Sequence, residues 1–187
     1  MNQIDEIKPI VPYRPNLPIL GGLILFTVIL GTTRLGYIPV PTEAIHATSM
    51  HLPTIVASVV EGWPAGMIVG MVFGITSMYM AGSPMSSDPL VAMVPRLLVG
   101  LTPYLAYILL SRFNEYVRLA VAAVVGTLTN TVGFLGMSVI LGYLNWDTAL
   151  YIAWVHGLPE CVVAIVITIP AVFLMRRVKV FLTQFTQ

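Results

Sequence analysis

Long apolar runs separated by short polar segments dominate the sequence. The runs cover residues 17–33, 44–60, 64–81, 90–110, 117–141 and 148–175. A helix needs about 20 mostly apolar residues to cross the hydrocarbon core of a bilayer. The pattern therefore predicts an all-α membrane protein with six transmembrane helices in a compact bundle.

Glycine and proline add detail to three of these runs. Pro53 interrupts the second run, and Pro159 and Pro170 predict tilt or kinks in the last, long one. In the third run Gly66, Gly70 and Gly74 are spaced four residues apart. This spacing places the glycines on one helical face, where a neighbouring helix can approach closely.

Composition supports a membrane location and excludes other classes. Hydrophobic residues make up 57% of the chain and charged residues 9%, whereas soluble domains carry about 25% charged residues. The net charge of +1 gives no reason to expect nucleic-acid binding. A single cysteine, Cys161, excludes a framework of disulfides within the chain. The polar, proline-containing start of the chain does not resemble a cleavable signal peptide.

Lysine and arginine in the short loops predict the orientation in the membrane. With the N-terminus inside, six crossings place seven basic residues on the cytoplasmic side and only Arg34 and Arg96 toward the outside. Both termini are then cytoplasmic. The expected organisation is a cytoplasmic segment at 1–16, a transmembrane domain at 17–177 and a cytoplasmic tail at 178–187. The seven residues are Lys8, Arg14, Arg112, Arg118, Arg176, Arg177 and Lys179.

Polar side chains within the runs gather toward the predicted outer side. Ionisable groups inside membrane spans are costly and usually functional, so their position predicts a pocket that opens to the outside. The candidate ligand-binding residues come from the first outer loop and from the fourth, fifth and sixth runs. They are His46, His51, Arg96, Asn130, Trp154, His156 and Glu160.

Structural roles are the alternative for each candidate. His46 and His51 fit ordinary loop positions, Trp154 fits the interfacial aromatic belt, and Arg96 could pair with Asp88 or Glu160 to hold the bundle together. His156 and Glu160 are four residues apart and share one helical face. Ligand contact is favoured for this pair because Pro159 interrupts the helix there, and such breaks are tolerated where they line a cavity.

Motifs for zinc hydrolysis, serine hydrolysis and ATP binding are missing from the sequence. Hydrolysis of ATP would therefore need partner subunits. A small intramembrane enzyme that uses His156 and Glu160 remains an alternative, as does a purely structural subunit.

Several segments resemble one family of membrane proteins. Residues 51–57, 62–77, 88–101, 126–131 and 157–160 are similar, in this order, to segments of the substrate-binding S components of energy-coupling-factor (ECF) vitamin transporters. The branch that binds riboflavin, folate and pantothenate is the most similar, and within it the pantothenate-type proteins.

The resemblance implies a six-helix subunit of a prokaryotic cell membrane that captures a vitamin from outside and topples to release it inside. Its partners would be a transmembrane scaffold subunit and two cytoplasmic ATPases, which use the ATP, so the chain itself needs no cofactor. The outer loops and the fourth to sixth helices would line the pocket, and small residues of the first helix, here Gly21 and Gly22, would contact the scaffold.

Pantothenate is the expected ligand. The guanidinium of Arg96 suits a carboxylate, and Asn130 and His156 suit the amide and hydroxyl groups. A hydroxymethylpyrimidine precursor of thiamine is an alternative, with Glu160 contacting the aminopyrimidine and Trp154 stacking on its ring. Folate and riboflavin are further alternatives.

Overall fold

The computed structural model describes residues 15–33, 35–39, 46–80 and 82–184. Within these residues the chain forms seven helices and one two-stranded antiparallel sheet, so the prediction of a helical protein is confirmed. The elements are α1 (Leu17–Thr32), β1 (Tyr37–Pro39), β2 (His46–Thr48), α2 (His51–Glu61), α3 (Trp63–Met80), α4 (Pro84–Ser87), α5 (Pro89–Leu109), α6 (Glu115–Ile140) and α7 (Trp146–Gln184).

Several helices begin at polar residues that the sequence places just before an apolar run. The side chains of Asn16, Asp88 and Asn114 accept hydrogen bonds from backbone N–H groups in the first turns of α1, α5 and α6. These bonds satisfy donors that have no partner within the helix. Pro18 and Pro89 follow two of these caps, in the first turn, where a missing N–H costs nothing.

Four helices, α3, α5, α6 and α7, are long and apolar enough to cross a membrane, and α1 is a shorter apolar helix of 16 residues. The predicted second run at 44–60 was wrong in its extent. Helix α2 has only 11 residues and begins at His51, because residues 46–48 form a strand instead. At its other end Gly62, with a φ of 94°, allows the sharp turn into α3.

The β-hairpin was not predicted. Strands β1 and β2 pair antiparallel, with Tyr37 opposite Thr48 and Pro39 opposite His46. The hairpin joins α1 to α2, and the backbone N–H of Ser49 donates to the carbonyl of Gly36 at its base. Arg34 lies outside the described residues, so its predicted place toward the outside stays a prediction.

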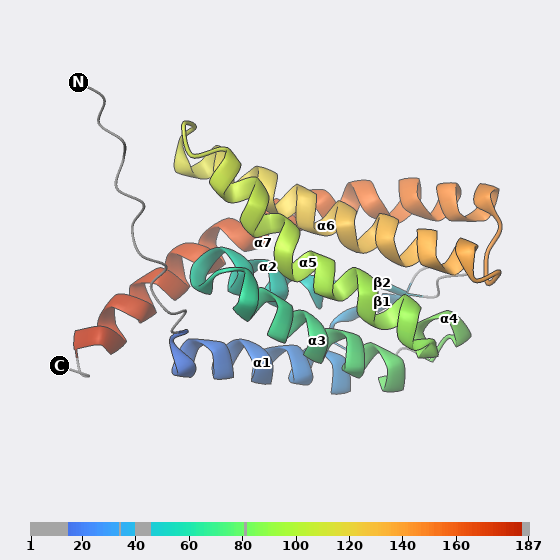
Figure 1. Cartoon of the computed structure of the whole chain (residues 1–187), viewed down its shortest axis with the longest axis horizontal. Coiled ribbons are helices and arrows are strands. Elements are labelled where there is room, and N and C mark those ends of the chain that lie inside the picture. Colours follow the sequence, from blue (N-terminus) through green and yellow to red (C-terminus); the bar gives the residue numbers. More distant parts are fainter. Residues whose placement is uncertain (1–14, 34, 40–45, 81, 185–187) are drawn as a thin grey trace, which may run out of the picture.

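Figure 1 shows how the helices are arranged. Helix α1 begins and α7 ends at the same end of the bundle, where the α2–α3 turn and the α5–α6 loop also lie. The β-hairpin, α4 and the α6–α7 turn lie at the opposite end, which we call the hairpin end. Helix α5 packs extensively against both α3 and α6. The arrangement agrees with an even number of crossings from the start of α1 to the end of α7, with both helices counted.

The glycine stripe of α3 lets α5 approach its backbone, as predicted. A Cβ atom added to Gly70 would lie 2.2 Å from the carbonyl oxygen of Arg96, and one added to Gly66 would lie 2.3 Å from that of Gly100. Any larger side chain at these positions would force the two helices apart. The close approach fixes the backbone of α5 around Arg96.

Helix α7 extends beyond the predicted end at residue 175. It continues to Gln184, so the helix extends into the segment predicted as the cytoplasmic tail. Val178 and Leu182 pack against the hydrophobic core, and the ammonium of Lys179 lies 3.0 Å from the carboxylate of Glu61. The last turns of α7 are therefore attached to the end of α2.

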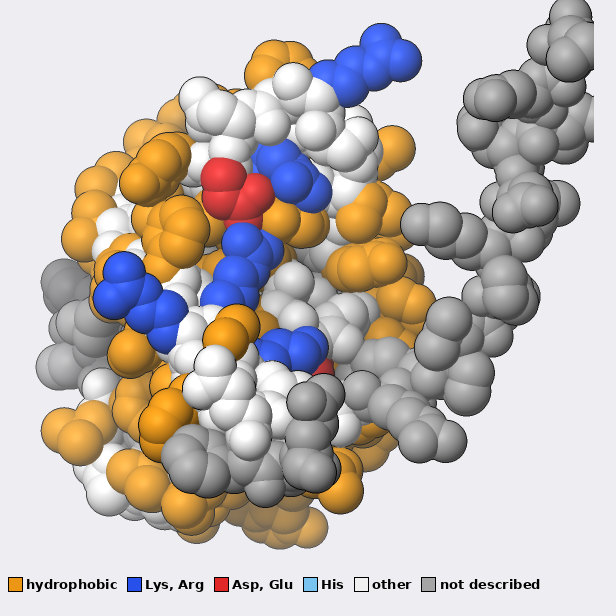
Figure 2. All heavy atoms as spheres, turned by 90° about the vertical axis from the view of Figure 1, so that its left-hand side faces the viewer, with side chains coloured by type: hydrophobic (Ala, Val, Ile, Leu, Met, Phe, Trp, Pro, Cys, Tyr) orange, Lys and Arg blue, Asp and Glu red, His pale blue; other side chains and the backbone are white. Residues whose placement is uncertain are grey.

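Basic side chains gather at the end opposite to the hairpin, and Figure 2 shows this face. One group is a network around Glu115, which binds the guanidinium groups of Arg118 and Arg176 and accepts a hydrogen bond from the hydroxyl of Tyr107. Five of the seven residues predicted for this side are described. All five lie in the α5–α6 loop, at the start of α6 or near the end of α7, which Figure 1 shows at this end: Arg112, Arg118, Arg176, Arg177 and Lys179.

Candidate functional site

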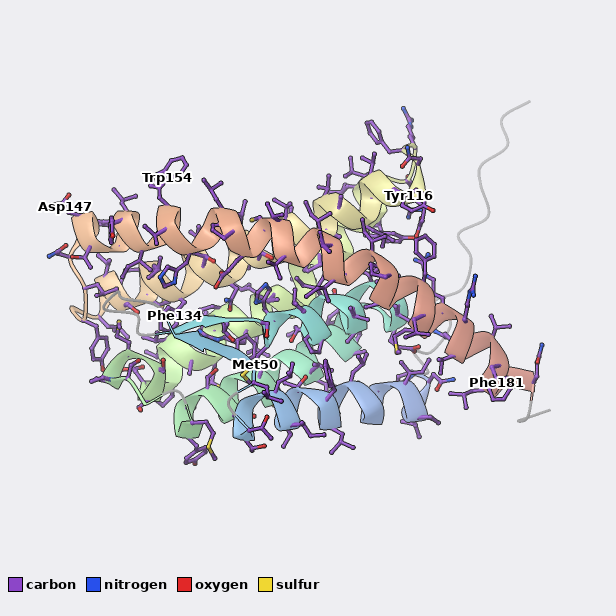
Figure 3. All side chains as sticks on the ribbon, turned by 180° about the vertical axis from the view of Figure 1, so that it is seen from behind. Met50, Tyr116, Phe134, Asp147, Trp154 and Phe181 are labelled. Atoms are coloured by element: carbon purple, nitrogen blue, oxygen red, sulfur yellow. The ribbon has the colours of Figure 1, made fainter. Side chains whose placement is uncertain are left out.

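Arg96 is a buried cation near the middle of the bundle. Only 4% of the residue is exposed, and its Nη1 donates a hydrogen bond to the carbonyl of Val91 at 2.9 Å. Its Cζ lies 4.9 Å from the ring centre of Phe73 on α3 and 4.7 Å from that of Phe134 on α6. Figure 3 shows Phe134 between α6 and the hairpin. Aromatic rings favour a nearby cation, so the two rings stabilise the buried positive charge.

Asn130 lies one helical turn before Phe134 on the same face of α6. It is 4% exposed, and its Oδ1 has no hydrogen-bond partner among the described residues. A buried acceptor without a partner costs about 1–3 kcal/mol. This oxygen is therefore suited to accept a hydrogen bond from a ligand.

Glu160 of α7 joins three parts of the structure. Its Oε1 accepts a hydrogen bond from the backbone N–H of Thr48 on β2 at 3.2 Å, and its Oε2 accepts one from the hydroxyl of Thr131 on α6 at 3.3 Å. The carboxylate thus attaches the hairpin to the two long helices beside the site.

His156 lies on the same face of α7, one turn before Glu160, as the sequence predicted. It is 6% exposed, and the adjacent Gly157 faces Thr131 of α6, whose methyl carbon would lie 3.7 Å from an added Cβ. Glu160 is directed toward Thr131 of α6, and His156 lies one helical turn away on the same face of α7.

His51 occupies a buried position instead of a loop. It is the first residue of α2 and is 2% exposed, and its Nε2 lies 3.1 Å from the hydroxyl oxygen of Thr127 on α6. The hydroxyl of Thr127 donates to the carbonyl of Ala123, so it accepts from a protonated Nε2. His51 thus links α2 to α6 below the hairpin.

The remaining predicted residues do not join this cluster. Trp154 is 67% exposed and points away from the bundle (Figure 3), which fits the alternative of an interfacial belt residue. His46 belongs to β2, but its side chain lies outside the described part of the structure. Gly21 and Gly22 are exposed on α1, and an added Cβ would meet nothing within 4 Å.

Sequence reasoning missed four residues of the site: Phe73, Phe134, Thr48 and Thr131. The spacing of four residues between Asn130 and Phe134 could have indicated the latter. Thr48 takes part through its backbone N–H, which leaves no signal in the sequence. Phe73 gave no signal either, because it is one apolar residue among many in α3.

The site combines a buried guanidinium, an amide oxygen, a histidine and a carboxylate that already accepts two hydrogen bonds. Among the described residues, no three histidine, cysteine, aspartate or glutamate side chains lie close enough to hold a metal ion. Such a set can bind an anionic, hydrogen-bonding small molecule near the hairpin end. We refer to Arg96, Asn130, His156 and Glu160, with the rings of Phe73 and Phe134, as the Arg96 site.

Comparisons with known proteins identify the family. A family model described as "ECF transporter, substrate-specific component" matches residues 18–172. The pantothenic acid transporter PanT of Lactococcus lactis subsp. cremoris is 29% identical over 152 residues, an alignment that covers 66% of this chain and 74% of the relative. Members of this family are transport subunits that work with an energising module, so a catalytic role for His156 and Glu160 is not carried further. The chain is a multi-pass membrane protein and belongs to the family of substrate-specific components of ECF transporters.

Proposed function

We propose that the chain captures pantothenate from outside the cell at the Arg96 site and delivers it to an ATP-driven ECF importer. The observation that carries this proposal is the buried guanidinium of Arg96, which contacts the rings of Phe73 and Phe134. Asn130, with its unpartnered oxygen, lies one helical turn before Phe134. A carboxylate matches a guanidinium through two parallel hydrogen bonds, and a hydroxyl or amide N–H would satisfy the oxygen of Asn130.

Pantothenate offers these groups in one small molecule. It has a carboxylate, a secondary amide and two hydroxyl groups. Side chains four residues apart on a helix are about 5–6 Å apart at their Cβ atoms, so Phe134, which contacts Arg96, and Asn130 can face neighbouring parts of one small acid. The relative named as a pantothenic acid transporter supports the same choice.

The arrangement disfavours a hydroxymethylpyrimidine ligand. That alternative needs Trp154 to stack on the ring and Glu160 to contact the aminopyrimidine. Trp154 points away from the bundle, and both oxygens of Glu160 already accept hydrogen bonds. Folate and riboflavin remain as competitors in the binding experiment below.

The proposed topology has six crossings with both termini in the cytoplasm. Helices α1, α3, α5, α6 and α7 supply five apolar segments, and α2 together with the hairpin supplies the sixth. The end that carries five described arginine and lysine residues then faces the cytoplasm, which agrees with the usual excess of basic residues on that side. The Arg96 site then lies in the outer half.

The proposed contact with the scaffold subunit is a groove beside α1. The groove has a volume of about 640 Å³ and lies between α1, α2 and α7. Its lining is almost entirely apolar and includes Gly22, Leu23, Phe26 and Val56. Because an added Cβ at Gly22 meets nothing, a helix of the scaffold can approach α1 closely there. The two ATPases would bind the scaffold and not this chain.

Equilibrium binding of radiolabelled pantothenate to the purified protein tests the proposal. Arg96→Gln should weaken binding by about 10–100-fold, because a hydrogen bond to a charged group is worth about 1.5–3 kcal/mol. Arg112→Gln, an exposed arginine at the other end, is the matched control. Unlabelled folate, riboflavin and hydroxymethylpyrimidine should compete poorly. No saturable binding at micromolar concentration, or equal losses in the two variants, would contradict the proposal.

A further inference from the structure

A second groove lies on a neighbouring face of α7, between this helix and the start of α6. It has a volume of about 550 Å³ and is lined by Tyr116 of α6 and by Pro170, Phe173, Leu174 and Arg177 of α7. Figure 1 shows the last part of α7 diverging from α6 toward α1. Proline within a helix is a common cause of such bends, and Pro170 lies in the wall of the groove.

The wall of the groove is aromatic, and the groove opens toward the surroundings of the bundle. The rings of Tyr116 and Phe173 have centres 5.6 Å apart and are inclined at 52°. Tyr116 and Leu174 are more than half exposed. Tyrosine is typical of the boundary between the hydrocarbon layer and water. The groove therefore lies where a lipid tail meets its headgroup.

Arg177 differs from the neighbouring arginines in its charge environment. Arg118 and Arg176 both bind the carboxylate of Glu115. Arg177, at the mouth of the groove, is exposed and has no hydrogen bond or ion pair within the described part of the chain. None of the described side chains therefore neutralises its positive charge.

We propose that this groove binds one anionic phospholipid of the cytoplasmic leaflet. The guanidinium of Arg177 contacts the phosphate, and one acyl chain lies along the paired rings of Tyr116 and Phe173. An arginine matches a phosphate through two parallel hydrogen bonds, and basic pockets between transmembrane helices on the cytoplasmic side suit anionic headgroups. The apolar part of the groove excludes a free phosphate ion as its full occupant.

Native mass spectrometry of the full chain in detergent tests this inference. Phosphatidylglycerol and phosphatidylcholine with identical acyl chains are titrated separately, and the bound fraction of one lipid is measured. Wild type should retain phosphatidylglycerol over phosphatidylcholine. Arg177→Gln should weaken phosphatidylglycerol binding about fivefold, as expected for one basic residue at an anionic surface. Arg112→Gln is the matched control and should leave the binding unchanged.

Three results would overturn the proposal. Equal retention of the two lipids would show that the headgroup is not recognised. Equal losses in the Arg177 and Arg112 variants would show diffuse attraction by the basic end. Displacement of the lipid by millimolar inorganic phosphate would show an ion site without a lipid tail. Vitamin binding by each variant checks that it is folded, since neither residue belongs to the Arg96 site.

Discussion

The carboxylate of Glu160 accepts a hydrogen bond from the backbone N–H of Thr48, which lies 112 residues earlier in the chain. The donor belongs to the β-hairpin and the acceptor to the longest helix. A second bond from the hydroxyl of Thr131 holds the same carboxylate against α6. The hairpin is thus attached directly beside the Arg96 site, and the attachment depends on one side chain.

Glu160→Gln should loosen the hairpin. The amide keeps one acceptor oxygen without the charge, so the bond from Thr48 is either lost or weakened, whichever donor the oxygen faces. Because hydrogen bonds to a charged group contribute about 1.5–3 kcal/mol each, exchange of the Thr48 amide should accelerate by about tenfold or more. Hydrogen-exchange mass spectrometry of residues 46–50 measures this. Trp154→Phe, on the outer face of the same helix, is the control, and unchanged exchange in Glu160→Gln would contradict the attachment.

Gly70→Ala should destabilise the protein by separating α3 from α5. The new methyl group would lie 2.2 Å from the carbonyl oxygen of Arg96, and such overpacking costs about 1–3 kcal/mol. Gly136→Ala is the matched control, because an added Cβ there meets nothing within 4 Å. Helix propensity alone would favour that alanine by about 1 kcal/mol. When thermal unfolding is measured in detergent, the midpoint temperature should therefore fall for Gly70→Ala and not for Gly136→Ala.

A contact between Asp88 and Tyr143 makes the hairpin end sensitive to acid. The hydroxyl of Tyr143 donates to the carboxylate of Asp88 at 2.9 Å, and this bond lowers the pKa of Asp88 from its ordinary value. An aspartate whose pKa is lower in the folded than in the unfolded protein stabilises the fold. This contribution is fully present above the pKa of the unfolded state, and it is lost as the pH falls through the pKa of the folded state. The loss therefore occurs below the ordinary range of an aspartate.

Tyr143→Phe tests this contact without removing the ring. The pKa of Asp88 should rise toward its ordinary value, because the lowering hydrogen bond is gone. Titration of the carboxylate by NMR in detergent measures the change. The bonds from the backbone N–H groups of Leu90 and Val91 remain, so a smaller lowering should persist. An unchanged pKa would show that the phenol does not contact the carboxylate in solution.

Lys179→Met should destabilise the junction between α7 and α2. The carboxylate of Glu61 is almost fully buried, with 1% of its side chain exposed. Among the described residues it would keep only the hydrogen bond from the backbone N–H of Asn16. Breaking a buried pair costs about 3–5 kcal/mol. About 1–3 kcal/mol is expected here, because the side chain of Lys179 is 39% exposed and solvent screens the pair.

The double variant Glu61→Gln, Lys179→Met separates charge from packing. If the single change acts by leaving a buried carboxylate unpaired, the double variant should recover part of the lost stability. Guanidinium or urea unfolding followed by circular dichroism can compare the three proteins. Equal losses in the single and double variants would show that the lysine stem, and not its charge, holds α7 in place.

The sequence predicted which segments are helical and at which end the polar residues gather, because both depend on hydropathy and spacing alone. It failed where short-range backbone pairing decided the structure. Residues 46–48 continue into an apolar run, and hydropathy cannot distinguish a three-residue strand from the start of a helix. The strand forms because its partner, Tyr37–Pro39, lies nearby across a loop.

The assignment of Trp154 to the pocket shows a different limit. Residues two apart on an α-helix differ in direction by about 200°, so Trp154 and His156 cannot face the same ligand. The spacing alone could have excluded either Trp154 or His156 from the predicted pocket. What spacing could not show is which face of α7 meets α6, and the structure answers this through the contact of Gly157 with Thr131.

The length of α7 couples the two ends of the molecule mechanically. A helix of 39 residues is about 58 Å long at 1.5 Å per residue, nearly twice the hydrocarbon thickness of about 30 Å. Glu160 and Lys179 lie on this one helix, on either side of the bend at Pro170. The hairpin contact at Glu160 and the junction with α2 at Lys179 are therefore joined by one continuous hydrogen-bonded backbone, and a change in the bend at Pro170 would move one relative to the other.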